Sequence, residues 1–219
     1  MMKSTYILAL LSAVLWFGCS KDKGPTRSER IQAYIDAGWT EYAANEFTDA
    51  RDEFGSALDL DSTSAGAQVG YAWSTMQIPR ADVRDVFSII TNDATEDLTV
   101  QTDAWTVMSG AHLVLREYPP ADSLALLVLT TDSSYVFTND PNVDWRDVLL
   151  LRGQALYFMS FYDSSWTVIQ PLVIGTNYEH IDYTDPTTWS ISTNPSAETY
   201  TIFAGVVSII LEALTEDYR

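Results

Sequence analysis

The chain has 219 residues, 47% of them hydrophobic, which is ample apolar material for one domain or a short row of stacked repeats. Its 12 Lys and Arg residues stand against 30 Asp and Glu, a net charge of −18 that argues against nucleic-acid binding, which needs a basic face. A single cysteine excludes an internal disulfide and a cysteine-based zinc cluster, and two histidines leave little for a histidine-rich metal site.

Residues 1–18 have the features of an export signal. Lys3 supplies a positive charge near the start, and an apolar stretch of about 13 residues runs from Thr5 to Phe17. This stretch is shorter than the roughly 20 residues that span a bilayer, and its length is typical of a signal peptide. The chain's only cysteine, Cys19, follows Gly18 and precedes a polar run.

This arrangement resembles the signal of bacterial lipoproteins, in which cleavage falls before the cysteine and lipid is attached to its thiol. The resemblance implies a signal peptide over 1–18, a lipidated (palmitate-bearing) Cys19 and a flexible tether over 19–28. Trp16 and Phe17 depart from the family's usual residues, and Ser20 in place of aspartate favours the outer membrane over the inner one. An ordinary secretory signal, or a membrane anchor with a chance cysteine, is the alternative.

The charges divide along the chain. All three lysines precede residue 24, and the body from residue 24 onward has nine arginines against 29 acidic residues, a net −20. The basic tether can lie against anionic head groups while the acidic body is repelled from them. The alternative is that an acidic surface simply keeps an exported protein soluble. The most hydrophobic stretch of the body, 143–161, is interrupted by three charges and predicts a buried helix.

Segment 31–62 predicts a helical hairpin. Small residues at Gly38, Ala50 and Ala57 let two helices approach closely, while Phe47 and Phe54 fill the space between them. A polar turn at 43–46 separates the helices. The pattern resembles a tetratricopeptide repeat, although Ser62 stands where that family usually has proline.

Fainter copies follow the first hairpin. Starting from Gly38, the successive steps to their first-helix small residues, Ala72, Ser109 and Gly153, are 34, 37 and 44 residues. The expected second-helix residues are Val83, Phe87 and Ile90, then Ala121, Ala125 and Val128, then Ser165, Ile169 and Leu172. The resemblance therefore predicts an all-α fold, a short α-solenoid of about four tetratricopeptide-like hairpins over 29–173. A plain irregular helical bundle is the alternative.

The C-terminal part divides in two. Residues 174–194 form a polar stretch without helical period, which predicts a functional loop or a short hairpin. Residues 195–219 predict a capping helix, with Asn194 as N-cap, Pro195 in its first turn and apolar residues at helical spacing.

Chemical motifs are scarce. Asp140 to Asp144 resembles the start of a calcium loop but lacks its glycine and glutamate, so a turn with Asp144 capping the next helix is favoured. His112 lies in an apolar helix and is expected to serve packing. No nucleophile elbow, phosphate-binding glycine loop or paired-histidine motif occurs in the sequence. We therefore expect no enzyme, no cofactor and no metal site.

The remaining candidate is a binding surface. In the tetratricopeptide family the first helices line a groove that holds peptide segments of partners. That resemblance implies a groove with equivalent positions in successive hairpins, and aromatic residues there suit binding. The groove candidates are Trp39, Tyr42, Trp73, Gln77, Gln154 and Tyr157. The tryptophans have an alternative role in packing between hairpins.

Tyr178, His180, Tyr183 and Trp189 make the 174–194 loop a second candidate surface, and a merely solvated loop is the alternative. The expected function is a lipid-anchored scaffold that binds a protein or peptide partner in the bacterial cell envelope, in the periplasm or at the cell surface. The rival is a carbohydrate-binding lipoprotein that uses some of its 7 Trp and 12 Tyr residues. A hydrolase is a third class, for which no site is evident.

Overall fold

The structure, a computed structural model, describes residues 24–90, 97–188, 190–193, 196–199 and 203–217. The signal segment and Cys19 lie outside the described residues. Within the described ranges the elements are α1 (Arg27–Ala43), α2 (Phe47–Leu60), α3 (Ala65–Gln77), α4 (Asp85–Ile89), α5 (Leu98–Val114), α6 (Tyr118–Thr131), α7 (Trp145–Phe158), α8 (Tyr162–Val173), a 3-10 turn (Pro186–Thr188), β1 (Ser190–Thr193), β2 (Ser196–Thr199) and α9 (Phe203–Asp217).

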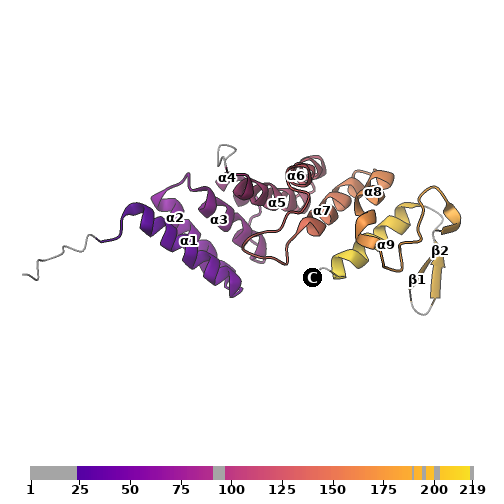
Figure 1. Cartoon of the computed structure of the whole chain (residues 1–219), viewed down its shortest axis with the longest axis horizontal. Helices are drawn as coiled ribbons and strands as arrows, with labels where there is room; N and C mark the ends of the chain where they lie inside the picture. Colours follow the sequence, from indigo (N-terminus) through magenta and orange to yellow (C-terminus); the bar gives the residue numbers. More distant parts are fainter. Residues whose placement is uncertain (1–23, 91–96, 189, 194–195, 200–202, 218–219) are drawn as a thin grey trace, which may run out of the picture.

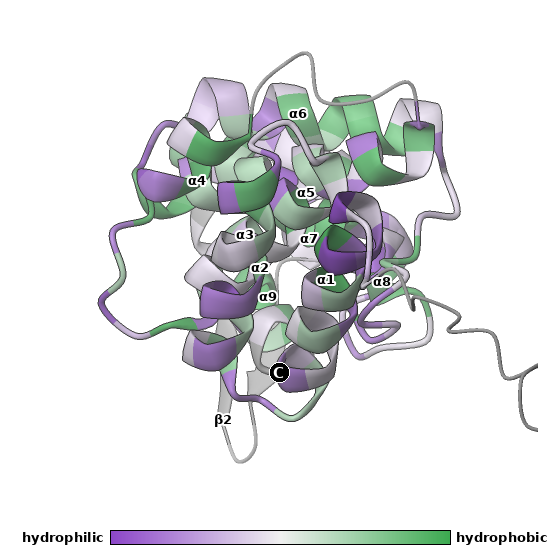
Figure 2. Ribbon diagram, turned by 90° about the vertical axis from the view of Figure 1, so that its left-hand side faces the viewer, coloured by the Kyte–Doolittle hydropathy of each residue, from purple (hydrophilic) through white to green (hydrophobic). Residues whose placement is uncertain are grey.

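The helices pack side by side in chain order and form one row, a helical solenoid (Figure 1). α1 contacts α2, α2 contacts α3, and the same order continues from α5 through α8. α9 lies across α7 and α8 and closes the C-terminal end of the row. Figure 2 views the row from the end where α1 and α2 lie and shows hydrophobic residues on α6. Two leucines of this helix, Leu126 and Leu127, are partly exposed. The predicted all-α solenoid of hairpins with a C-terminal helix is confirmed.

Phe54 is the centre of the first hairpin. Its fully buried ring lies between α1 and α3, where it faces Gly38 on one helix and Gly70 on the other. A Cβ atom at Gly38 would lie 2.7 Å from the ring's Cζ atom, and one at Gly70 would lie 2.3 Å from its Cε1 atom. The two helices can hold the ring this tightly only because neither position carries a side chain.

Gly38→Leu is therefore expected to destabilise the first hairpin by about 1–3 kcal/mol, because the added side chain has no space beside the Phe54 ring. Chemical denaturation monitored by circular dichroism measures this change. Gly55→Ala is the control, since a Cβ there meets only Tyr71 at 3.8 Å, and it should stabilise the helix by up to about 1 kcal/mol. An unchanged or raised stability for Gly38→Leu would contradict the packing of Phe54 described here.

Three hairpins repeat one packing pattern. In each, a small buried residue of the first helix is followed 12, 16 and 19 residues later by buried residues of the second helix. These sets are Gly38 with Ala50, Phe54 and Ala57; Ser109 with Ala121, Ala125 and Val128; and Gly153 with Ser165, Ile169 and Leu172. A buried hydroxyl ties the helices of two hairpins together, because Ser109 Oγ donates to the Ala121 carbonyl at 2.8 Å and Ser165 Oγ to the Gly153 carbonyl at 2.7 Å.

The turns of the same three hairpins are alike as well. Seven residues after the small residue comes a position with positive φ, at Asn45 (63°), Arg116 (63°) and Ser160 (66°). At each turn two backbone N–H groups bond back to the last turn of the first helix, as Asn45 does to Tyr42 and Glu46 to Glu41. This is the Schellman arrangement, which satisfies the free carbonyl groups at a helix end. The repeated turn is independent evidence that the hairpins are equivalent units.

The second hairpin is irregular. Its second helix, α4, has only five residues, and Val86 is its fully buried residue. Val83 and Phe87 pack against the core from the side, and Ile90 is buried just after the helix end. The predicted assignment of Val83, Phe87 and Ile90 to one helix therefore needs correction, because α4 begins after Val83 and ends before Ile90.

The C-terminal region also differs from the expectation of a single helix over 195–219. Ser196–Thr199 pairs in antiparallel register with Ser190–Thr193, and α9 begins only at Phe203. Asn194 and Pro195, the predicted helix start, lie outside the described residues. A β-hairpin thus takes up the first part of the predicted capping helix, while Val207, Ile210, Leu211 and Leu214 of α9 are buried in the C-terminal core.

Candidate functional site

The candidate site is the face shared by α1, α3, α5, α7 and α9, here called the inner face. Each of these helices contacts the next one in that order, although other helices separate them in the sequence. In Figure 1 this face runs along the lower side of the row. Its two halves differ, because a loop of the chain covers part of the N-terminal half, whereas the C-terminal half has two adjoining pockets.

The N-terminal half is covered by residues 132–144, the connection between α6 and α7, called the inserted segment below. It folds as a narrow loop in which Phe137 N–H donates to the Val143 carbonyl at 2.9 Å and Trp145 N–H to the Tyr135 carbonyl at 2.8 Å. Tyr135 and Phe137 are buried, whereas Val136 between them is exposed. The alternation is that of an extended strand with one face against the helices.

The two candidate tryptophans pack on this segment. The Trp73 ring stacks on Phe137 with centroids 4.3 Å apart and an angle of 13° between the planes. Trp39 contacts both Phe137 and Phe54 edge-on, at 5.7 and 4.8 Å. Trp73 is only 7% exposed and Trp39 is half-buried. This corrects the groove interpretation for Trp73, because Phe137 of the chain itself covers the tryptophan ring.

Tyr42 is withdrawn from the surface, whereas Gln77 beside it stays exposed. Tyr42 is buried, and its hydroxyl oxygen accepts a long hydrogen bond of 3.5 Å from Gln77 Nε2. Burial raises the pKa of Tyr42 to about 12. Together with Ala43, these residues form one wall of a pocket of about 420 Å³, whose other wall is Asp140 and its neighbours in the inserted segment.

A buried carboxylic acid fastens the inserted segment to α5. The Tyr135 hydroxyl donates to Asp103 Oδ1 at 2.9 Å, and Asp103 is 4% exposed. Burial raises the pKa of Asp103 to about 7, the hydrogen bond from Tyr135 opposes that rise, and the charge of Asp97 adds to it. Burial also raises the pKa of the Tyr135 phenol, with the nearby Asp103 charge as the next cause. The sequence analysis missed this pair, which joins residues 32 positions apart.

Beyond the inserted segment the inner face opens into a pocket of about 300 Å³ between α3, α5 and α7. Its walls are mostly apolar, and Trp73, Met76, Val107, Val143, Leu150 and Leu151 contribute to them. Asp147 adds a carboxyl group whose pKa is raised, mainly by burial. Gln154 and Thr215 stand at the far side and belong equally to the next pocket.

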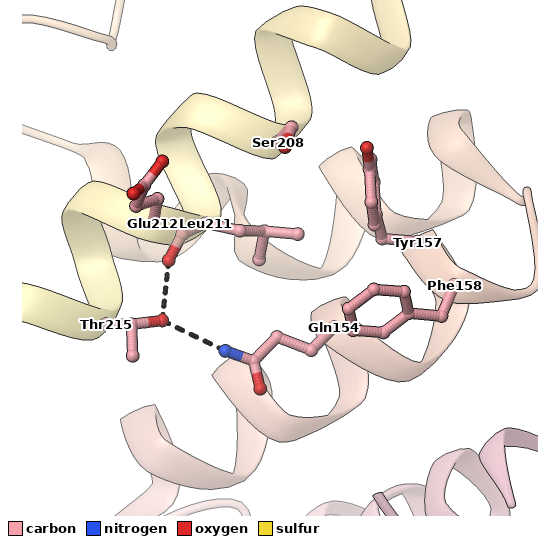
Figure 3. A pocket seen from close by; sticks show the side chains of 7 residues that line it. All are labelled: Gln154, Tyr157, Phe158, Ser208, Leu211, Glu212 and Thr215. Carbon is pink, nitrogen blue, oxygen red and sulfur yellow. Dashed lines mark hydrogen bonds between the residues drawn. The ribbon is translucent and has the colours of Figure 1, made fainter. Parts of the chain in front are cut away.

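The second pocket lies between α7 and α9 and has a volume of about 420 Å³ (Figure 3). Tyr157 and Phe158 of α7 stand on one side, and Ser208, Leu211 and Glu212 of α9 on the other. Gln154 Nε2 donates to Thr215 Oγ1 at 2.9 Å, and the Thr215 hydroxyl donates to the Leu211 carbonyl. The first of these hydrogen bonds joins α7 to α9 at the base of the pocket, and the second orients the Thr215 hydroxyl.

Of the six predicted groove residues, five line pockets: Gln154 and Tyr157 the pocket between α7 and α9, Trp73 and Gln77 the apolar pocket, and the buried Tyr42 the pocket beside the inserted segment. Trp39 is half-buried and packs against Phe54 and Phe137. The sequence analysis missed Phe158, Glu212 and Thr215. Phe158 was detectable as the neighbour of Tyr157, whereas nothing local in the sequence shows that α9 docks beside α7.

The second candidate surface, the 174–194 loop, is attached through Ile181, which is buried in the C-terminal core, and through the half-buried Tyr178. His180 and Tyr183 are exposed. Trp189 lies outside the described residues. Part of the loop therefore serves the core, while two of its described candidates are exposed.

The calcium-like sequence forms the predicted turn. Asp140 Oδ1 accepts from the backbone and side chain of Asn142, at 3.1 and 3.0 Å. Asp144 caps α7, since its Oδ1 accepts from Arg146 N–H at 2.7 Å and its own N–H donates to Asp147 Oδ2 at 2.8 Å. Among the residues that the structure describes, no three His, Cys, Asp or Glu side chains are grouped so that they could hold a metal ion.

No family model matches the sequence, and neither the curated proteins nor the solved structures contain a match. Within the described ranges, no helix is both long and apolar enough to cross a bilayer. The site must therefore be interpreted from its own geometry.

Proposed function

We propose that the chain is a lipid-anchored protein of the bacterial cell envelope that acts as a scaffold for protein–protein contacts. The partner would bind the C-terminal half of the inner face, where two adjoining pockets share Gln154 and Thr215. The observation that carries this proposal is the exposed Phe158, which lines the second pocket and is 54% exposed. Large exposed aromatic side chains beside a pocket are typical anchors of binding surfaces.

The shape of the chain supports a scaffold. Rows of helical hairpins offer long surfaces built from equivalent positions, and their usual task is recognition rather than chemistry. The pocket walls hold few titratable groups: Asp147 in the first pocket and Glu212 in the second, beside the Tyr157 phenol. Asp147 already caps α7, which gives its carboxyl group a structural role.

Site-specific photocrosslinking in living cells tests the proposal. A photoreactive residue in place of Phe158 is expected to give a discrete adduct with one envelope protein. The same residue in place of Leu127, a partly exposed position on α6 outside the pockets, is the matched control and should not give that adduct. Identical adduct patterns at both positions, or none at either, would contradict a partner site on the inner face.

The carbohydrate-binding alternative also uses exposed aromatic rings, because sugars stack on them. A glycan array with the purified protein separates the two functions. Binding of a neutral glycan that is lost in Phe158→Ala, without any protein adduct in cells, would favour the carbohydrate-binding function.

The proposed anchor makes its own prediction. Cys19→Ala is expected to abolish labelling with radioactive palmitate and to move the protein from the membrane fraction to the soluble or unprocessed fraction, because the lipid chains supply the membrane affinity. Ser20→Ala, next to the cysteine, is the control and should leave labelling intact. Unchanged labelling and membrane association of Cys19→Ala would show that the lipoprotein interpretation is wrong.

A further inference from the structure

The chemistry of the pocket between α7 and α9 indicates what kind of side chain it accepts. Resting on the scaffold function proposed above, we infer that this pocket receives the cationic side chain of a lysine or arginine in a basic segment of the partner protein. The inference depends on the carboxylate of Glu212, the rings of Tyr157 and Phe158, and the charge of the chain as a whole.

Glu212 is the one acidic residue among the described residues that line the pocket, and no Lys, Arg or His stands beside it in the wall. It is exposed on α9, and within the described part of the chain it takes part in no ion pair. Arg152 of α7 pairs with α6 instead, because its Nε donates to Asp122 Oδ1 at 2.8 Å. Among the residues that the structure describes, the Glu212 carboxylate therefore has no ion-pair partner and is open to a cation that enters the pocket.

The aromatic side of the pocket suits the same ligand. The rings of Tyr157 and Phe158 are nearly perpendicular, with centroids 5.5 Å apart and an angle of 75°. Phe158 is supported from behind by Tyr118, whose ring stacks on it at 5.0 Å. The face of an aromatic ring attracts a cation, and the attraction grows where water is partly excluded. A cation held between these rings and Glu212 would gain from both sides of the pocket (Figure 3).

The polar base of the pocket is already organised. Because Gln154 and Thr215 bond to each other across the two helices, the pocket needs little rearrangement to receive a side chain. A volume of about 420 Å³ lies within the range of preformed ligand sites, which begins at roughly 300 Å³. The adjoining apolar pocket can take a neighbouring aliphatic residue of the same segment.

The overall charge favours a cationic partner from a distance. The body of the chain from residue 24 onward has no lysine, and its nine arginines face 29 acidic residues. Such a charge attracts a basic segment before contact and repels an anionic one. A neutral glycan gains nothing from this field, which is why we prefer a basic peptide to a sugar as the occupant.

Fluorescence polarisation with the full-length chain in non-ionic detergent tests the inference. The probes are a labelled alternating Ser-Lys octapeptide and the same peptide with every lysine acetylated. We expect only the lysine peptide to bind. Its affinity should fall about tenfold in Glu212→Gln and at least about threefold in Phe158→Leu, which keeps an apolar side chain but removes the ring.

Glu46→Gln is the matched control, because it removes the same charge from an exposed position at the turn between α1 and α2. Its affinity for the lysine peptide should stay within about twofold of the unchanged chain, since only long-range attraction is reduced. Equal weakening by Glu46→Gln and Glu212→Gln would show non-specific attraction to an acidic surface and would overturn the inference. So would equal binding of the acetylated peptide, or no binding of either peptide.

The two proposals can fail separately. If the photoreactive residue at Phe158 gives its adduct but Glu212→Gln binds the lysine peptide as well as the unchanged chain does, the scaffold function stands and the cation pocket is wrong. If the adduct is absent while the peptide binds in the predicted order of variants, the pocket accepts cations and the scaffold function is wrong.

Discussion

Trp73→Ala is expected to lower the free energy of unfolding by about 3–5 kcal/mol, the range typical of a buried large aromatic residue. The ring is almost completely buried and stacks on Phe137, so its removal leaves a cavity beneath the inserted segment. No buried hydrogen bond is lost, because the Trp73 indole N–H has no partner among the described residues. The expected loss is therefore one of packing alone.

Urea denaturation of Trp73→Ala, of Phe137→Ala and of the double variant that combines them measures this effect. Trp73→Ala combined with Phe137→Ala should cost less than the sum of the two single changes, because both remove the same stacked contact. Phe158→Ala is the control, since its exposed ring should contribute little to stability. A second double variant, Trp39→Ala with Trp73→Ala, should melt at a clearly lower temperature than the unchanged chain. An unchanged melting temperature would show that the inserted segment does not cover this half of the inner face.

The hairpins were predictable because their packing repeats at fixed spacing. Gly38, Ser109 and Gly153 were recognised as small residues, and the residues that follow them by 12, 16 and 19 positions are buried as expected. The second hairpin departs from this spacing, because Pro79 interrupts it and its second helix, α4, has only five residues. Helical period is informative only where both helices are long enough to display it.

The inserted segment was not predicted, although the sequence holds a trace of it. The step from Ser109 to Gly153 is 44 residues, ten more than the first step, and those ten correspond to a loop with turn residues around Tyr135-Val136-Phe137. In the structure, burial alternates there as it does along a strand, but the three apolar residues show no such alternation in the sequence. What no local pattern shows is that this strand lies on Trp73, because that contact depends on how distant helices pack.

The candidate site was predictable only in part, for the same reason. Gln154 and Tyr157 follow from the repeat positions, since equivalent residues of successive hairpins share one face. Glu212 and Thr215 do not, because they reach the pocket through the docking of α9, some 60 residues further along the chain. A pocket between elements remote in sequence has no signature in either element alone.

The second large effect is a loss of stability with rising pH, caused by Asp103. Its pKa is raised to about 7 in the folded chain, from an ordinary value of 3.8. Below pH 3.8 the acid is protonated in both the folded and the unfolded chain, so its titration does not change the free energy of unfolding. Between pH 3.8 and 7 the unfolded chain gives up the proton while the folded chain keeps it, so stability falls as pH rises. The difference amounts to about 4 kcal/mol by pH 8.

Asp103→Asn is the variant that isolates this effect. Its amide oxygen can still accept from the Tyr135 hydroxyl, so the contact between α5 and the inserted segment is kept while the titration disappears. Unfolding by urea at pH 5 and pH 8 should show a markedly smaller loss of stability in the variant. Tyr135→Phe should act in the opposite direction, because a buried carboxylate without its hydrogen-bond donor is costlier to ionise.

Asp97 and Asp147 are the other acidic groups whose charges bear on the pair, the first on Asp103 and the second on Tyr135. The Asp147 carboxyl, whose pKa is also raised by burial, adds to the loss of stability at high pH in the unchanged chain and in both variants alike. The comparison between variants therefore removes its contribution. Equal pH dependence in the unchanged chain and in Asp103→Asn would mean that Asp103 is ionised throughout this range. The segment would then be held by the stacking of Phe137 on Trp73 without help from a protonated acid.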